Sequence, residues 1–339
     1  MKVLLTGAFG NIGLSAIEEI IRQGDKVRCF DLKNKRNEKI FKRLKKEYGE
    51  RIEVFWGDIT REEDIEEALK DQDIAVHLAF IIPKLSVTGL ESEKVPDIAY
   101  KVNVIGTKNL VDAMEKASYP KKIIFTSSLH VFGITQNLVP PRKVDDPLNP
   151  PEHYSRHKVE CENLIKNSNL TWSIYRLAAS LPISVKLDIG MFDVPLENRM
   201  EYVHTKDVGL AIAKGVRSEK IWGKVLLIGG GPKCQYYYRD ILQRVLESIG
   251  VGMLPEEAFS DKFFATDWLD TKESEEILHY QRRTIEDYVE DVKRELGYRI
   301  FFIKLFRPTV RFILLKKSPY YKRRLIPLKV LLEGYNKLF

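Results

Sequence analysis

Short apolar runs alternate with amphipathic stretches over the first half of the chain. The runs have the length of buried strands, and the amphipathic stretches carry apolar residues at helical spacing. The predicted strands are 2–5, 26–30, 52–56, 74–79 and 122–128. The predicted helices between them are 14–21, 37–48, 62–70 and 98–117. Strands that alternate with helices predict an α/β fold with a doubly wound parallel sheet, whose ligand crevice lies at the carboxyl ends of the strands.

Three glycines three residues apart follow the first predicted strand: Gly7, Gly10 and Gly13. Between a strand and a helix, the first glycine permits a tight turn and the second lets backbone N–H groups approach a pyrophosphate. The third permits close packing of helix and strand. A tight turn without a ligand is the alternative for the glycines alone. The next strand ends at Asp31, the distance expected for a carboxylate that holds the adenosine ribose hydroxyls, so we predict a dinucleotide site.

The acid at the end of the second strand favours NAD over NADP, because the Asp31 carboxylate would repel a 2′-phosphate. Lys33, Lys35 and Arg36 follow it directly, and a basic cluster beside the ribose is what NADP needs. A solvated loop is the alternative explanation of that cluster. We therefore expect NAD, with NADP as the alternative. Asp58, at the end of the third strand, is a candidate partner of the adenine amine.

Candidate chemistry lies at the end of the fifth strand, where Ser127 and Ser128 stand, and on a helix that begins near Tyr154. Tyr154 and Lys158 are spaced i, i+4 and share one helix face. A phenol has a pKa near 10, and lowering it by roughly 3 units takes about 4 kcal/mol. A lysine cation and an oxidised nicotinamide could supply this. Tyr154 would take the proton of a substrate hydroxyl, Ser128 would hold the same oxygen, and Lys158 would also bond the nicotinamide ribose.

The motifs TGAFGNIG, GDIT, HLAF, NVIGT, IFTSSLHVFG and YSRHK, in this order and spacing, resemble the extended short-chain dehydrogenase/reductase family over about residues 1–235. That family includes NAD-dependent nucleotide-sugar epimerases and dehydratases, 3β-hydroxysteroid-type dehydrogenases and dihydroflavonol-type reductases. The resemblance implies a Rossmann-type fold and catalytic roles for Ser128, Tyr154 and Lys158. It adds Ala79 and Asn103 to the expected cofactor contacts.

The expected cofactor site combines these motif residues with their immediate neighbours. It comprises Gly7, Phe9, Gly10, Asn11, Ile12, Gly13, Asp31, Leu32, Asp58, Ile59, Leu78, Ala79, Phe80, Asn103, Thr126, Tyr154, Lys158 and Leu177.

Two departures from the family pattern bear on the reaction. Sugar-nucleotide dehydratases carry Asp-Glu directly after the catalytic Ser or Thr, whereas Leu129 and His130 stand here, and leucine cannot transfer a proton. The segment that should cover the substrate, 179–200, is short and mostly apolar, and Arg199 is its obvious phosphate partner unless it is merely an exposed cation. We expect Ser127, His130 and Arg199 to contact substrate, with His130 as a second acid or base.

The short apolar lid favours an NAD(P)-dependent oxidoreductase that transfers a hydride between the nicotinamide and a secondary alcohol or ketone. A nucleotide-sugar C4 epimerase uses the same Ser/Tyr/Lys set with a retained NAD, and it is the alternative. A non-catalytic nucleotide-binding scaffold ranks last, because it would have no need of all three residues. In each case the expected partner is a small molecule.

Cysteine spacing argues against a metal site. Cys29, Cys161 and Cys234 are far apart, so neither a zinc site nor a disulfide framework is expected. The first strand begins at residue 2 and leaves no room for a leader, and no run of about 18 uncharged apolar residues occurs. We expect a cytoplasmic enzyme.

Charge is concentrated at the end of the chain. Residues 299–339 carry eleven Lys or Arg and one acid, Glu333, whereas the rest carries 44 bases and 47 acids. Lys304, Arg307 and Arg311 share one helical face with apolar residues elsewhere, which is typical of a helix on an anionic membrane surface. That would place the enzyme peripherally on the inner membrane face. A homodimerisation arm and a helix packed on the body are alternatives, and nucleic acid is not expected.

These patterns divide the chain into three parts. Residues 1–178 form the dinucleotide-binding domain, to which 201–232 returns. Residues 179–200 and 233–298 form a substrate-binding region, and 299–339 form a basic amphipathic tail.

Overall fold

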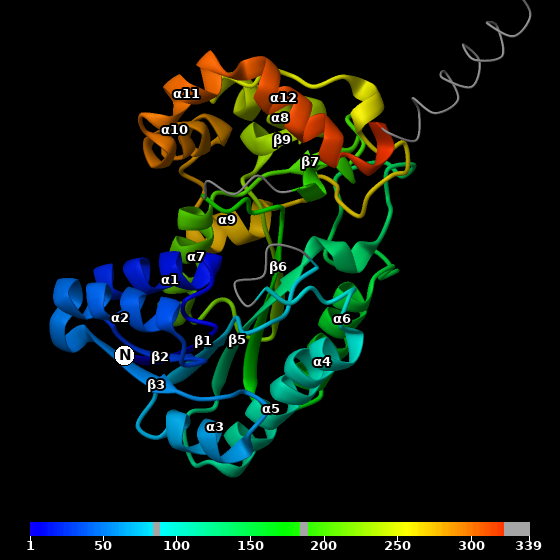
Figure 1. Cartoon of the computed structure of the whole chain (residues 1–339). Helices are drawn as coiled ribbons and strands as arrows, with labels where there is room; N and C mark the ends of the chain where they lie inside the picture. Colours follow the sequence, from blue (N-terminus) through cyan, green and yellow to red (C-terminus); the bar gives the residue numbers. More distant parts are fainter. Residues whose placement is uncertain (84–88, 184–188, 322–339) are drawn as a thin grey trace, which may run out of the picture.

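A computed structural model describes residues 1–83, 89–183 and 189–321. Residues 184–188 of the expected lid and 322–339 of the expected tail lie outside the described residues. The larger sheet has seven parallel strands in the order β3-β2-β1-β4-β5-β6-β8 (Figure 1). They are β1 (Lys2–Thr6), β2 (Lys26–Asp31), β3 (Ile52–Trp56), β4 (Ile74–His77), β5 (Lys122–Ser128), β6 (Thr171–Leu177) and β8 (Lys224–Ile228). The order reverses between β1 and β4, which confirms the predicted doubly wound α/β fold.

Helices cover both faces of this sheet (Figure 1). One face carries α1 (Asn11–Arg22), α2 (Lys35–Tyr48) and α7 (Thr205–Arg217). The other carries α3 (Glu62–Leu69), α5 (Gly106–Lys116) and α6 (His153–Lys166). Because both faces are buried, the strands read as nearly continuous apolar runs rather than as alternating ones. His77 is fully buried in β4, and its ring bonds Thr6 and Thr107 at 2.7 and 2.9 Å.

The predicted helix over 98–117 is interrupted. It consists of α4 (Pro96–Tyr100), a π-helical turn over Lys101–Ile105 and α5. Asn103 lies in the π-helical turn and bonds the backbone of Ile81 twice, through Oδ1 to the amide N at 2.6 Å and through Nδ2 to the carbonyl at 3.0 Å. The turn therefore fixes the segment that leaves β4, which forms a wall of the candidate site. Turns of this kind occur often at functional sites.

The second region has a hydrophobic core of its own. It contains the antiparallel pair β7 (Arg199–Glu201) and β9 (Gln235–Tyr237) with α8 (Tyr238–Ser248) and α10 (Ile285–Leu296), whereas α9 (Lys272–Leu278) packs on the core of the larger sheet through Leu278. Its largest buried side chains include Phe192, Tyr202, Phe259 and Tyr288. The boundaries predicted from the sequence are consistent with two cores, and they remain a proposal.

The start of the predicted tail forms two helices, α11 (Arg299–Leu305) and α12 (Arg307–Lys317). Pro308 occupies the first turn of α12, where its missing N–H is tolerated. The helix is therefore interrupted at Phe306, and α11 and α12 are separate helices. Leu314 of α12 is 5% exposed within the second core, which means that this part of the tail packs on the body. In the three described ranges, no helix has the length and apolarity needed to cross a membrane.

Candidate active site

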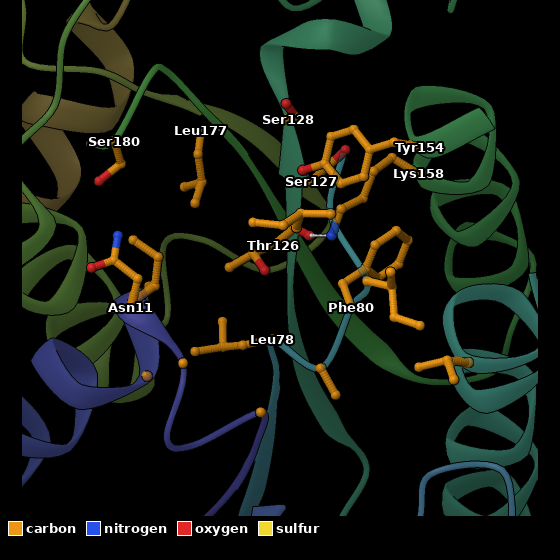
Figure 2. Close-up of a pocket in the computed structure, with 18 of the residues that line it drawn as sticks. Asn11, Leu78, Phe80, Thr126, Ser127, Ser128, Tyr154, Lys158, Leu177 and Ser180 are labelled. Carbon is orange, nitrogen blue, oxygen red and sulfur yellow. Dashed lines mark hydrogen bonds between the residues drawn. The ribbon is translucent and has the colours of Figure 1, made fainter. Parts of the chain in front are cut away.

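A cavity of about 430 Å³ opens at the carboxyl ends of the parallel strands (Figure 2). The glycine loop after β1 and the ends of β2 and β3 line one side, and the end of β5 with α6 lines the other. Of the expected cofactor contacts, all but Phe9 and Asn103 line this cavity. Ser127, Ser128 and His130 also line it, whereas Arg199 does not.

The glycine loop is shaped by close backbone approach. Gly7 has φ +65°, and a Cβ there would lie 2.7 Å from the backbone N of Ala79. A Cβ on Gly13 would lie 2.4 Å from the carbonyl O of Ala8. With Gly10 at its N-cap, α1 starts at the cavity, and no side chain caps its free N–H groups. Such a helix start is a ready site for a phosphate group.

Asp31 holds the loop together at the end of β2. Its Oδ2 accepts a hydrogen bond from the Phe9 amide at 2.9 Å, and its Oδ1 accepts one from the Leu32 amide at 2.8 Å. Burial raises the pKa of Asp31, although these two N–H groups and Arg36 act in the opposite direction. The side chain of Phe9 is fully buried, with its ring centroid 5.6 Å from that of Trp56. This packing fixes the backbone whose amide donates to Asp31.

The basic cluster after β2 stays out of the cavity lining. Arg36 donates to the carbonyl O of Phe9 and to Oδ1 of Asn37, each at 3.0 Å. Lys33 approaches Glu38 at 3.8 Å. Of the charged residues at and just after the end of β2, Asp31 therefore lines the cavity and the basic cluster does not.

Lys158 lies buried between α6 and β5. Its Nζ donates to the carbonyl O of Thr126 at 2.5 Å, drawn in Figure 2, and stands 3.5 Å from the ring centroid of Phe80 and 4.7 Å from that of Phe125. No carboxylate among the described residues forms an ion pair with it. Burial lowers the pKa of Lys158 to about 7.

Tyr154 stands one helical turn before Lys158, beside Ser128 (Figure 2). Burial raises the pKa of Tyr154 to about 12, although its hydrogen bond with Ser128 acts in the opposite direction. Its ring meets Phe80 edge-on, with centroids 5.8 Å apart. The side chains predicted to do chemistry therefore lie together in the lining of the cavity, and with this raised pKa the phenol of Tyr154 is protonated at neutral pH.

The structure adds a partner that sequence reasoning missed. Nδ1 of His130 is 3.2 Å from Oε2 of Glu152, and the His130 ring lies edge-on to Tyr154 at 6.0 Å. Glu152 is also the N-cap of α6, where it forms a capping box with Ser155. An acid three residues before a serine at the start of a predicted helix is a signal that could have identified this cap. Its pairing with His130 needs the fold.

The other lining residues lie within or next to the strands and motifs expected from the sequence. They are Phe30, Gly57, Ile81, Ile82, Pro83, Val102, Leu129, Ala178, Ala179 and Ser180. Most are apolar, so the side of the cavity beyond Tyr154 is a mainly apolar surface.

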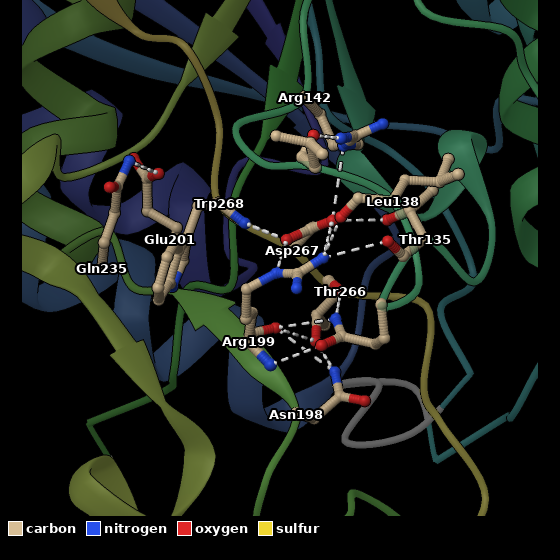
Figure 3. Close-up of polar contacts among 12 residues, drawn as sticks. Thr135, Leu138, Arg142, Asn198, Arg199, Glu201, Gln235, Thr266, Asp267 and Trp268 are labelled. Carbon is tan, nitrogen blue, oxygen red and sulfur yellow. Dashed lines mark hydrogen bonds and ion pairs between the residues drawn. The ribbon is translucent and has the colours of Figure 1, made fainter.

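Arg199 belongs to a separate polar network (Figure 3). Its Nε donates to Oδ1 of Asp267 at 2.7 Å, and its Nη2 donates to the carbonyls of Thr135 and Leu138 at 3.0 and 2.9 Å. Asp267 is 1% exposed and also pairs with Arg142 at 3.3 Å. Through Nε and Nη2 the guanidinium joins β7 to the loop after β5, and the structure does not bring it to the cavity.

Comparison with known proteins relates this arrangement to a described family. Residues 4–175 match the model of the 3-beta hydroxysteroid dehydrogenase/isomerase family. A UDP-glucose 4-epimerase of Lactobacillus helveticus is 30% identical over 165 residues, which are 49% of this chain and 46% of that protein. The N-acetyl-alpha-D-glucosaminyl-diphospho-ditrans,octacis-undecaprenol 4-epimerase of Escherichia coli O157:H7 is also 30% identical over 165 residues, 49% of this chain and 43% of that protein. The chain spans about half the length of the curated relatives it matches.

Solved structures share the fold. A UDP-glucose-4-epimerase from Stenotrophomonas maltophila, with bound NAD and formylated UDP-arabinopyranose, superposes with a TM-score of 0.72 at 20% identity. The match covers 87% of this chain and 97% of that one.

Burial of Lys158 predicts that the difference in unfolding free energy between Lys158→Met and the wild type depends on pH. Below pH 7 the amine is protonated in the folded and the unfolded chain, so the full cost of burying the charge is present. Between pH 7 and the ordinary pKa of 10.5 the folded chain binds fewer protons, and the cost fades as the pH rises. Lys158→Met should therefore be more stable than the wild type at pH 7, and this gap should narrow by about 3 kcal/mol by pH 10.

Urea unfolding at several pH values measures the gap, and titrations of other groups cancel between the two proteins. Lys42→Met, on an exposed part of α2, is the matched control for loss of an amine at the surface. A gap between Lys158→Met and wild type that stays constant from pH 7 to 10 would show that the buried amine does not titrate as described.

Proposed function

Because the chain belongs to the 3-beta hydroxysteroid dehydrogenase/isomerase family, within the extended short-chain dehydrogenase/reductase enzymes, we propose that it is an NAD-dependent 4-epimerase of a sugar carried on a diphosphate. The observation that carries the proposal is the convergence of Ser128, Tyr154 and Lys158 on the cavity that the glycine loop also lines. The predicted family membership is confirmed. Between the two activities considered from sequence, the named relatives favour the epimerase, which was the alternative.

The residues present fit NAD. The start of α1 and the glycine loop would hold the pyrophosphate, Asp31 the adenosine ribose, Asp58 the adenine amine and Lys158 the nicotinamide ribose. The Asp31 carboxylate in the cavity lining, and the bonding of Arg36 to the Phe9 carbonyl outside that lining, support NAD rather than NADP. In this assignment 1–178 and 201–232 bind the cofactor, while 179–200 and 233–298 recognise the substrate.

Tyr154 and Ser128 would act on the hydroxyl at sugar C4. When bound, oxidised NAD supplies the hydride acceptor and a positive charge. Tyr154 accepts the hydroxyl proton as the C–H hydride departs and the carbonyl forms, and Ser128 donates a hydrogen bond to the same oxygen. Inversion at C4 would require reduction of the carbonyl on its opposite face, and Tyr154 would return the proton to the same oxygen, so that the cofactor would be unchanged overall.

The pKa of Tyr154 sets the demand on its surroundings. Lowering it from about 12 to near 7 takes about 7 kcal/mol of preferential stabilisation of the phenolate. The Lys158 ammonium and the cofactor charge are the cations available for this among the described lining residues. A further role for His130 is to hold or protonate a second substrate oxygen, oriented by Glu152.

A second candidate function is oxidation of an apolar secondary alcohol. It is favoured by the apolar wall at Ile81, Ile82, Val102 and Leu129, and by the absence of any cation but Lys158 among the described lining residues. The same wall fits a diphosphate-linked sugar on a lipid, as in the name of the Escherichia coli relative. The apolar lining therefore does not distinguish a nucleotide from a polyprenol as the carrier of the sugar, and an experiment has to do so.

Turnover should separate these functions. NAD-loaded protein is offered UDP-glucose, UDP-N-acetylglucosamine and a polyprenyl-diphospho-N-acetylglucosamine, and both the C4 epimer and absorbance of NADH are followed. The proposal expects an epimer of one donor without net NADH. NADH accumulating in proportion to product would favour the oxidoreductase, and no conversion of any diphosphate-linked sugar would overturn the epimerase.

Tyr154→Phe tests the base. Removing the phenol oxygen should lower turnover by about a thousandfold, within the usual range for general base catalysis, while the NAD dissociation constant changes little. Isothermal titration with NAD and the epimer assay give the two values. Tyr100→Phe, a tyrosine whose hydroxyl bonds Glu160 outside the cavity, is the matched control. Turnover that survives Tyr154→Phe contradicts the assignment.

Asp31→Asn tests cofactor choice. The amide keeps an oxygen for the Phe9 or Leu32 amide but removes the charge that opposes a 2′-phosphate, so the preference for NAD over NADP should fall at least about tenfold, the equivalent of 1.4 kcal/mol. Titration with both dinucleotides measures the ratio. Glu38→Gln, which removes the exposed acid near Lys33, should leave it unchanged. An unchanged ratio in Asp31→Asn would remove Asp31 from cofactor selection.

A further inference from the structure

The outward side of α11 and α12 exposes large apolar side chains. These are Tyr298, Phe301, Phe302, Leu305, Phe306, Phe312 and Ile313, each between 48% and 76% exposed, and we call them the apolar face. Neighbouring rings contact each other, with centroids 5.6 Å apart for Phe301 and Phe302 and 6.4 Å for Tyr298 and Phe302. Ile300, Ile303 and Val310 already pack on the second core. The two helices thus expose apolar side chains that a surface helix would ordinarily lack.

The basic residues of these helices have two different placements. Arg307 and Arg311 donate to the carbonyls of residues 251–253 at 2.6–3.1 Å, and Arg311 is half-buried there while Arg307 stays exposed. The face shared by basic side chains in the sequence is thus turned partly toward the body, and the aromatic side chains point outward. Arg299, Lys304, Lys316 and Lys317 are exposed on the same two helices, and the aliphatic stem of Lys304 lies against Gly250.

The segment itself carries no acid to balance these cations. Residues 299–321 contain six Lys or Arg and no Asp or Glu. A two-fold contact between two copies of this face would bring like charges together, which opposes self-association. An anionic lipid surface is complementary to it in charge as well as in apolarity.

A second, apolar cavity of about 120 Å³ lies under the outer side of α12. Val310, Ile313 and Leu314 line it from the helix, and Met191 and Phe192 line it from the facing segment. Among the described residues, Lys317 is its one charged lining residue. An apolar hollow with an ammonium among its lining residues suits a hydrocarbon chain whose phosphate lies beside that ammonium.

We propose that the apolar face docks on an anionic lipid bilayer. Its aromatic and aliphatic side chains enter the boundary between headgroups and acyl chains, and the four exposed cations contact lipid phosphates. The cavity under α12 accepts the end of an acyl chain. The proposal is independent of the reaction catalysed, because none of these residues lines the active-site cavity.

Vesicle flotation with the full chain tests this docking. Wild-type protein should float with vesicles of phosphatidylcholine and phosphatidylglycerol, and binding should weaken in high salt and on phosphatidylcholine alone. Phe301→Ser with Phe306→Ser, and separately Lys316→Glu with Lys317→Glu, should each lower the partition coefficient about tenfold or more. Deletion of residues 299–339 is unsuitable, because Leu314 is buried and Arg311 holds backbone carbonyls.

Matched controls lie away from the face. Ile98→Ser on α4 removes a 50% exposed apolar side chain, and Lys42→Glu with Arg43→Glu changes two exposed cations of α2. Both should float like wild type, and thermal melts confirm that every variant is folded. Wild type that does not bind anionic vesicles, or binding that survives both tail variants, overturns the proposal. A dimer in light scattering that the tail variants dissociate, with no vesicle binding, would identify a second copy as the occupant instead.

Discussion

The buried amine of Lys158 is the constraint on which the candidate active site depends. Its Nζ has a backbone carbonyl and aromatic faces as partners, and the drop of its pKa to about 7 reflects the cost of this environment. In return the contact with Thr126 ties α6 to β5. One turn later, a fully buried pair between Glu162 and Arg176 ties the same helix to β6. Because these two contacts fix α6 against β5 and β6, they also fix Tyr154 beside Ser128.

The opposite end of the cavity is built from local sequence, which is why it could be predicted. The tight turn at Gly7, the packing at Gly13 and the carboxylate of Asp31 follow from strand, turn and helix in immediate succession. Two residues expected to touch the cofactor do not line the cavity. Phe9 supports Asp31, and Asn103 fixes the backbone of Ile81 through a π-helical turn that helical periodicity does not reveal.

Contacts between distant segments could not be read from the sequence. His130 contacts Glu152 across 22 positions, because the loop after β5 returns to the start of α6. Arg199 contacts Asp267 across 68 positions, within the second region. From the sequence, Arg199 in an apolar lid is a candidate phosphate partner. The fold pairs it with the Asp267 carboxylate instead. The tail also depends on contacts between distant segments. Part of its predicted basic face donates to backbone carbonyls of the body, and its aromatic side chains are exposed. The catalytic roles themselves remain predictions.

Transfer of hydrogen at C4 tests the central claim most directly. A sugar donor that the protein turns over is prepared with deuterium at C4 and incubated with the NAD-loaded enzyme. If the wall formed by Ser128, Tyr154 and Lys158 directs hydride to NAD and back, the inverted product keeps its deuterium at C4 and free NADH carries none. Deuterium lost to water would contradict hydride transfer, and deuterium recovered in released NADH would contradict an epimerase that retains its cofactor.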